Sequence, residues 1–263
     1  MTDRGEALDL STLLVALVLS IARVYTFIRF SPIFTQVSFI GSVRYGVMFA
    51  LAIIPAPLVY DALQTSSPET FFPLLARELI IGLLLAFFVW LPFYALEFSG
   101  AIIDTQKGVA MAEDFNPLTE TTGTLTSELL TQIFTVYLFS SGLFLVSLNL
   151  LFISYEILPI TETDLSVVLQ GTEEILVAVG HLFYLSLAFA APVVGALLIS
   201  DIVITIVARF APQVNALVFN LPIKAVIALV FYIAFVKVLL PEASSIFLEG
   251  SEVIAKTLRS LVQ

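Results

Sequence analysis

The chain has 263 residues, of which 59% are hydrophobic and 12% charged, and its mean hydropathy is +1.06. A soluble domain carries about twice that share of charge, so the composition predicts a membrane-class protein with no separate soluble domain. The net charge of -10 argues against nucleic acid as a partner, and the absence of cysteine excludes disulfides, iron–sulfur clusters and thiolate zinc sites.

Six apolar segments follow one another along the chain. They run from Leu10 to Ala22, Tyr45 to Tyr60, Leu79 to Leu96 (interrupted by Pro92), Leu129 to Tyr155, Ile175 to Ser200, and Ala216 to Val236. About twenty apolar residues span a bilayer, which the last four segments roughly provide. The sequence therefore predicts an all-α, polytopic membrane protein. Because the N-terminus is acidic rather than basic, we expect the first segment to be retained rather than cleaved as a signal peptide.

Two polar connections divide this pattern. Residues 61–73 form one surface loop, and the acidic stretch from Leu158 ends at Thr172, a plausible N-cap for the next helix. The second connection separates a longer part, residues 1–165, from a two-helix part, residues 166–263. The tail from Ser244 to Gln263 has the apolar spacing of an amphipathic helix at a membrane interface or a partner surface.

The distribution of basic residues does not indicate on which side of a membrane the two ends of the chain lie. With six spans and both ends on one side, the positive-inside rule compares two sets of five: Arg4, Arg77, Lys237, Lys256 and Arg259 against Arg23, Arg29, Arg44, Lys107 and Arg209. Either the span boundaries are poorly drawn or the segments are not a simple lipid-facing bundle.

Catalytic chemistry is poorly supported. His181 is the single histidine, which excludes histidine-rich metal sites, and no Gly-x-Ser-x-Gly motif accompanies it. Asp61 and Asp201 lack the sequence context of an intramembrane aspartyl protease. We expect no enzymatic activity, no cofactor and no bound metal.

The first polar island lies between the third and fourth segments, from Leu96 to Gly123. Asp104 and Lys107 are three residues apart and are expected to pair on one helical face, and Glu97 lies on a similar face two turns earlier. This is either a solvated helix end or a polar lining at a pore or subunit contact. Gly100 and Gly108, which permit close backbone approach, favour the second interpretation.

The second polar island runs from Asp201 to Lys224. Pro212 should end the preceding helix, and Asn215 and Asn220 can bond to the backbone of the bend. We expect Arg209 to pair with a carboxylate, either Asp201 or one on a neighbouring subunit. An ordinary hairpin turn explains Pro212 but not the polar residues that continue to Lys224.

The two islands contain the runs PFYALEFSGAIIDTQKGVAMA and RFAPQVNALVFNLPIK. Together with the six apolar segments, these runs resemble the T subunit of the type III secretion export apparatus, the SctT/FliR family. The family pattern Asp-Asn-Gln-Arg-Gly reads here Asp104-Thr105-Gln106-Lys107-Gly108, and the Asn-Pro that follows is present as Asn116-Pro117. Lysine keeps the charge of arginine but loses its two-pronged contact. This form resembles the injectisome branch more than the flagellar one.

The resemblance implies slanted helical hairpins that assemble with R-like and S-like subunits into the entrance of a secretion channel at the bacterial inner membrane. Residues 1–165 would be R-like and residues 166–263 S-like. The U-like switch protein, the V-like export gate protein and unfolded exported substrates would be further partners. Burial of apolar surface against these subunits would account for the even distribution of basic residues.

The resemblance also implies that the loop from about Gln106 to Gly123 is a plug that closes the pore. The plug residues would be Gln106, Lys107, Gly108, Val109, Met111, Phe115, Asn116 and Pro117, and the polar pore or intersubunit contacts would be Glu97, Asp104, Lys107, Asp201, Arg209, Asn215 and Lys224. An ordinary exposed connector is the alternative for the loop. For the whole chain, the alternatives are a flagellar export-gate subunit and a small ion-coupled transporter or channel.

Overall fold

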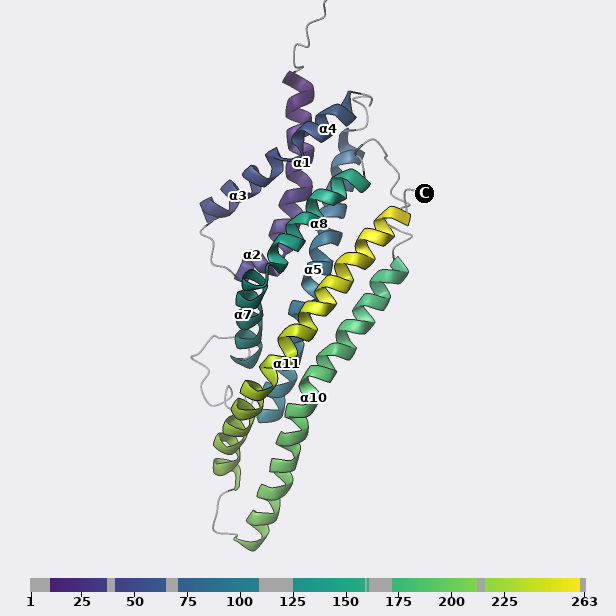
Figure 1. Cartoon of the computed structure of the whole chain (residues 1–263). Helices are drawn as coiled ribbons and strands as arrows, with labels where there is room; N and C mark the ends of the chain where they lie inside the picture. Colours follow the sequence, from purple (N-terminus) through teal and green to yellow (C-terminus); the bar gives the residue numbers. More distant parts are fainter. Residues whose placement is uncertain are drawn as a thin grey trace, which may run out of the picture. The chain divides into compact units, whose positions relative to one another are not determined.

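The computed structural model describes residues 10–36, 41–64, 71–108, 125–158, 160, 172–211 and 216–260. The described residues form helices, with no strand among them (Figure 1). The helices are α1 (Leu10–Phe30), α2 (Pro32–Gln36), α3 (Gly41–Ile53), α4 (Ala56–Leu63), α5 (Phe71–Lys107), α7 (Leu125–Ser140), α8 (Leu143–Ile157), α10 (Thr172–Phe210) and α11 (Ala216–Ser260).

Four of these helices, α1, α5, α10 and α11, are long and apolar enough to cross a membrane. Two further spans result if each bent pair counts as one: α3 with α4, bent by 51°, and α7 with α8, bent by 75°. This result confirms the predicted all-α fold with about six membrane-type segments.

The long helices extend further than the apolar pattern predicts. Helix α5 runs through Pro92 without interruption, α10 contains Pro192, and α11 contains Pro222 and Pro241. An interior proline removes one helical hydrogen bond, but breaking a helix in apolar surroundings would leave several backbone groups unpaired. The tail is helical as expected, although it continues α11 as far as Ser260 rather than forming a separate helix.

The segment from Leu129 to Tyr155 is two helices rather than one. Helix α7 ends at Ser140, and Gly142 has a φ of 80°, the left-handed conformation that glycine adopts without steric cost. Apolar composition alone gives no sign of this bend, whereas the sequence Ser-Ser-Gly is a turn signal.

The chain divides into two compact units, which we describe separately. The first contains Met1–Trp90, Ser141–Leu176 and Phe247–Gln263, and the second contains Leu91–Ser140 and Val177–Ile246. In the first unit, α3 and α4 pack against α1. The N-terminal half of α5 lies so close to α1 that a Cβ atom on Gly82 would be 2.4 Å from the carbonyl oxygen of Arg23.

The centre of the first unit is an ion pair that is fully buried. The Nε and Nη2 atoms of Arg23 donate to the two carboxylate oxygens of Glu78 at 2.6 and 2.9 Å, and both side chains have 0% exposure. Arg23 also donates to Ser154 Oγ and to the Leu158 carbonyl oxygen, and its guanidinium lies 4.0 Å from the ring centroid of Tyr155. These contacts join α1, α5 and α8 through one side chain.

Removing one member of this pair should destabilise the first unit strongly. Arg23→Met removes both charge-assisted hydrogen bonds to the buried Glu78 carboxylate and leaves it only the more distant Arg77, 3.7 Å away, as a cation; breaking a buried pair in this way typically costs roughly 3–5 kcal/mol. The double variant Arg23→Met/Glu78→Met should recover part of this loss, because it no longer buries the carboxylate, but it also removes the 3.7 Å ion pair between Glu78 and the buried Arg77. Thermal unfolding in detergent of the protein, purified after co-expression with R-like and S-like subunits, measures the difference.

The matched control is Arg29→Met, the same substitution at an exposed position of the same helix. It should leave the melting temperature almost unchanged. Equal effects at Arg23 and Arg29 would show that the buried pair has no special role.

Candidate functional site

In the second unit, the described residues of both polar islands lie on helices that pack against one another. Ile103 of α5 packs in a buried cluster with Ala190, Val193 and Leu197 of α10 and with Ala228 of α11. The C-terminal half of α5 therefore contacts both helices of the α10–α11 hairpin. This core determines where the polar residues at the end of α5 lie.

Asp104 is the central residue of the first island and has 0% exposure. Its carboxylate accepts a hydrogen bond from the backbone N–H of Thr126 at 2.8 Å and another from the Thr126 hydroxyl. A helix begins with backbone N–H groups that have no partner within the helix. Asp104 of α5 therefore caps the first turn of α7.

Lys107 completes this contact. Its ammonium group forms an ion pair with Asp104, as the three-residue spacing predicts, and donates to Thr126 Oγ1 at 2.7 Å. We call Asp104, Lys107 and Thr126 the α5–α7 cluster. It holds together the points where the chain leaves α5 and enters α7.

Gly100 allows this approach. A Cβ atom on Gly100 would lie 2.5 Å from both the Cα and the backbone nitrogen of Ser127, a separation that would force the two helices apart. The Ser127 hydroxyl donates to the Glu97 carbonyl oxygen at 2.7 Å. The expectation that Gly100 permits close backbone contact is therefore met, and Gly108, with a φ of 85°, follows the last residue of α5.

The second island joins the first through Gln106. The Asp201 carboxylate accepts from Lys224 Nζ at 2.7 Å, from Asn220 Nδ2 at 3.1 Å and from Gln106 Nε2 at 3.3 Å. Lys224 also donates to the Gln106 carbonyl oxygen at 2.9 Å. This Asp201–Lys224 cluster connects α5, α10 and α11, and it explains why a lysine occurs within the last apolar segment.

Asp201 pairs with Lys224, not with Arg209. Eight residues of helix separate Asp201 from Arg209, a rise of about 12 Å, whereas Lys224 lies on the facing helix. Arg209 is exposed and makes no ion pair within the part of the chain that the structure describes. Its pairing with a neighbouring subunit stays a prediction.

The other predicted site residues have different surroundings. The Glu97 side chain is exposed, although its backbone carbonyl bonds to Ser127. Val109, Met111, Phe115, Asn116, Pro117 and Asn215 lie outside the described residues. Sequence reasoning missed Thr126 as the partner of Asp104, but a hydroxyl residue at the start of an apolar run is a recognised signal for the beginning of a helix.

These features define a class of protein: a multi-span helical membrane protein whose helices are joined by buried polar contacts. The chain belongs to the family "Bacterial export proteins, family 1", whose pattern matches residues 14–250. This is the SctT/FliR family of export apparatus proteins that the two sequence runs indicated, and its members are structural transport proteins.

Relatives of both branches are similar to this chain. The Yop proteins translocation protein T of Yersinia pestis is 32% identical over 206 residues, which cover 78% of this chain and 79% of the relative. The surface presentation of antigens protein SpaR of Shigella sonnei is 33% identical over 77% of this chain and 80% of its own length. The flagellar biosynthetic protein FliR of Bacillus subtilis is 24% identical over 86% and 90%. The identity is therefore higher with the first two than with this flagellar protein.

Substituting Gly100 tests the close contact between α5 and α7. Gly100→Ala places a methyl group against backbone atoms of Ser127, which cannot rotate away. Overpacking of this kind costs about 1–3 kcal/mol, so the melting temperature of the protein, purified after co-expression with R-like and S-like subunits, should fall.

Gly195→Ala is the matched control, because a Cβ atom there meets nothing within 4 Å. Alanine is also the better helix former, so this variant should be as stable as the wild type or slightly more stable. A loss of stability that is the same at both positions would contradict the close contact.

Proposed function

We propose that the chain is a structural and gating subunit of a type III secretion export channel in the bacterial inner membrane, through which unfolded proteins pass. The observation that carries the proposal is the α5–α7 cluster. Asp104 and Lys107, near the end of α5, bind Thr126 at the start of α7, so both ends of the segment 109–124 are attached to one place.

Such an arrangement suits a gate. The ends would stay fixed by buried polar contacts, and the gating role would require the segment between them to rearrange without unfolding the helices. Val109, Met111 and Phe115 would supply apolar side chains to fill a narrow pore, with methionine the most adaptable of the three. Gly108, in the left-handed conformation, would be the hinge.

The rival function, an intramembrane ion relay, has less support. An ion relay would require four charged side chains to act together within the membrane: Asp104, Lys107, Asp201 and Arg209. The Asp201 carboxylate is paired with Lys224 and accepts hydrogen bonds from the side-chain amides of Asn220 and Gln106. Arg209 is exposed and does not reach Asp201.

Assembly with R-like and S-like subunits, and with the U-like and V-like proteins, is part of the proposal. The α10–α11 hairpin would be the S-like part of residues 166–263. Large apolar side chains of this hairpin are exposed in the single chain, among them Leu187, Ile202, Val226 and Ile233. Exposed apolar surface on this scale marks contacts with lipid or other proteins.

Shortening the proposed plug should open the channel without dismantling it. Deleting Ala110 to Thr119 leaves six residues, which can reach about 20 Å, and the ends need little reach because Lys107 and Thr126 are in contact. The complex should therefore assemble but conduct small ions. Purification of the complex measures assembly, and ion flux into inverted vesicles measures the leak.

The control is a flexible Gly/Ser sequence of equal length in place of Thr161 to Gln170, the connector that precedes α10. This variant should leave the membrane tight. The plug assignment is wrong if the deletion variant assembles normally and its vesicles also remain tight.

Expression should depend on partner subunits. Alone, the chain should aggregate or be degraded, because the exposed faces of α10 and α11 lack neighbours. Co-expression with R-like and S-like subunits should restore a soluble complex in detergent, measured by size-exclusion chromatography. A stable, monodisperse monomer from the chain alone would argue against assembly as its normal state.

A further inference from the structure

A carboxylate interrupts an exposed apolar surface of the second unit. The Glu97 side chain, on α5, is exposed, and it makes no ion pair within the part of the chain that the structure describes. Its neighbours on the same side of α5 are aromatic or apolar: Tyr94 lies one turn before it, Phe98 beside it and Ala101 one turn after it. Glu97 is therefore a charge among apolar neighbours.

Helix α10 extends this surface. The Phe98 ring stacks on the Phe183 ring of α10 with the centroids 5.9 Å apart, and the Tyr94 ring centroid lies 5.9 Å from that of Phe98. Phe98 is 42% exposed and Phe183 54% exposed. Leu187, one turn further along α10, is exposed as well. We call Tyr94, Glu97, Phe98, Phe183 and Leu187 the Glu97 surface.

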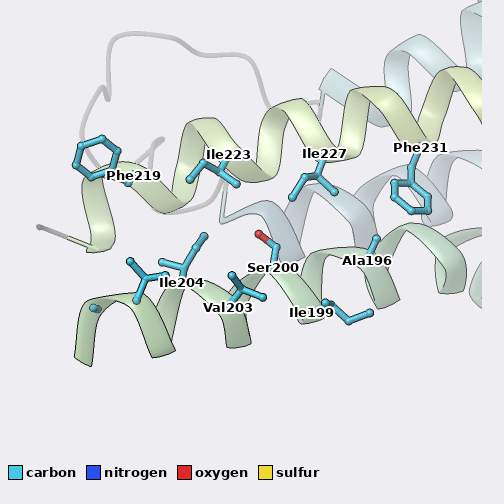
Figure 2. A pocket seen from close by; sticks show the side chains of 11 residues that line it. Ala196, Ile199, Ser200, Val203, Ile204, Phe219, Ile223, Ile227 and Phe231 are labelled. Atoms are coloured by element: carbon cyan, nitrogen blue, oxygen red, sulfur yellow. The ribbon is translucent and has the colours of Figure 1, made fainter. Parts of the chain in front are cut away.

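Figure 2 shows another apolar feature of this unit, the groove between α10 and α11, with side chains from both helices directed into it. Ser200 is the one polar side chain among the described lining residues, and none of them is charged. The groove thus has no group that would select one partner over another. The Glu97 surface has such a group, because a carboxylate attracts a cation.

Neither lipid nor water matches the whole Glu97 surface. An ionised carboxylate is costly against acyl chains, which offer it no partner. A lipid headgroup can offer a cation, but it lies among polar groups and water, whereas apolar side chains flank Glu97 on both sides along α5. Exposed aromatic and aliphatic side chains that adjoin one another mark an interaction site rather than the wall of a water-filled pore. A protein segment with one cation among apolar side chains complements both the charge and its surroundings.

The surroundings favour arginine over lysine as this cation. A guanidinium group is more weakly hydrated than an ammonium group, binds a carboxylate through two parallel hydrogen bonds and stacks on aromatic rings. The exposed parts of Phe98 and Phe183 provide such rings. The partner segment should be helical, because in apolar surroundings its backbone groups must be paired with one another.

We propose that the Glu97 surface binds an apolar helix of a neighbouring subunit that carries an arginine, and that this arginine pairs with Glu97 beside the rings of Phe98 and Phe183. The inference rests on the proposed assembly of the chain with other export subunits, and it specifies the chemistry of the partner at this contact. It does not involve segment 109–124, so it is independent of the gating role.

Photocrosslinking in the complete complex locates the partner. A photoreactive phenylalanine analogue replaces Phe183, and after illumination mass spectrometry identifies the residue that it has captured. The captured residue should lie within about two helical turns of an arginine in an apolar helix of another subunit. Capture of lipid, or of a protein segment that has no arginine within this range, would overturn the proposal.

The charge is tested at Glu97 itself. Glu97→Gln keeps the shape of the side chain and removes its charge, so the amount of chain that co-purifies with the captured subunit should fall by about tenfold or more. Glu242→Gln, at an exposed carboxylate of α11, is the matched control and should co-purify like the wild type. Combining Glu97→Arg with a glutamate in place of the partner's arginine should restore assembly, which a variant that had merely misfolded would not do.

The outcomes separate this inference from the proposed function. A wild-type chain that does not co-purify with other export subunits would contradict the proposed function. If the wild type assembles and Glu97→Gln assembles equally well, the arginine pairing alone is wrong. Normal assembly of Glu97→Gln with altered ion conductance would place Glu97 in the wall of a pore instead.

Discussion

The second unit depends on the contact between the Asp104 carboxylate and the first turn of α7. A carboxylate with no exposure is costly to bury unless its charge and its hydrogen-bonding capacity are both met. Thr126 supplies two donors and Lys107 supplies the opposite charge. The contact also supplies an acceptor to a helix start that would otherwise lack one. One residue of α5 thus determines where α7 begins.

Polar contacts have a particular importance in a chain this apolar. In lipid, and equally against apolar neighbours, the hydrophobic effect gives little preference for one helix register over another. Arg23 in the first unit and Asp201 in the second each bind groups from at least two other helices. Sliding any of these helices by one turn would separate several hydrogen bonds at once. These charged contacts therefore specify the arrangement more than they add to its stability.

Much of the fold could be predicted from composition and apolar length. The six segments, the end of α10 before Pro212 and the pairing of Asp104 with Lys107 all depend on local sequence, which a single chain displays directly. The partners of Arg23 and Asp201 could not be predicted, because Glu78 and Lys224 lie 55 and 23 residues away and only packing brings them close. The bend at Gly142 was missed because apolar composition continues on both sides of it.

Each helix of more than thirty residues contains at least one interior proline. Pro92, Pro192, Pro222 and Pro241 each deprive the carbonyl group four residues earlier of its helical donor, and proline sites are where long helices bend. The long helices α5, α10 and α11 are therefore not uniformly stiff. Each long helix bends most easily at its interior prolines. A sideways force on an assembly of these helices would therefore bend them there, and the polar contacts near the helix ends would keep their pairing.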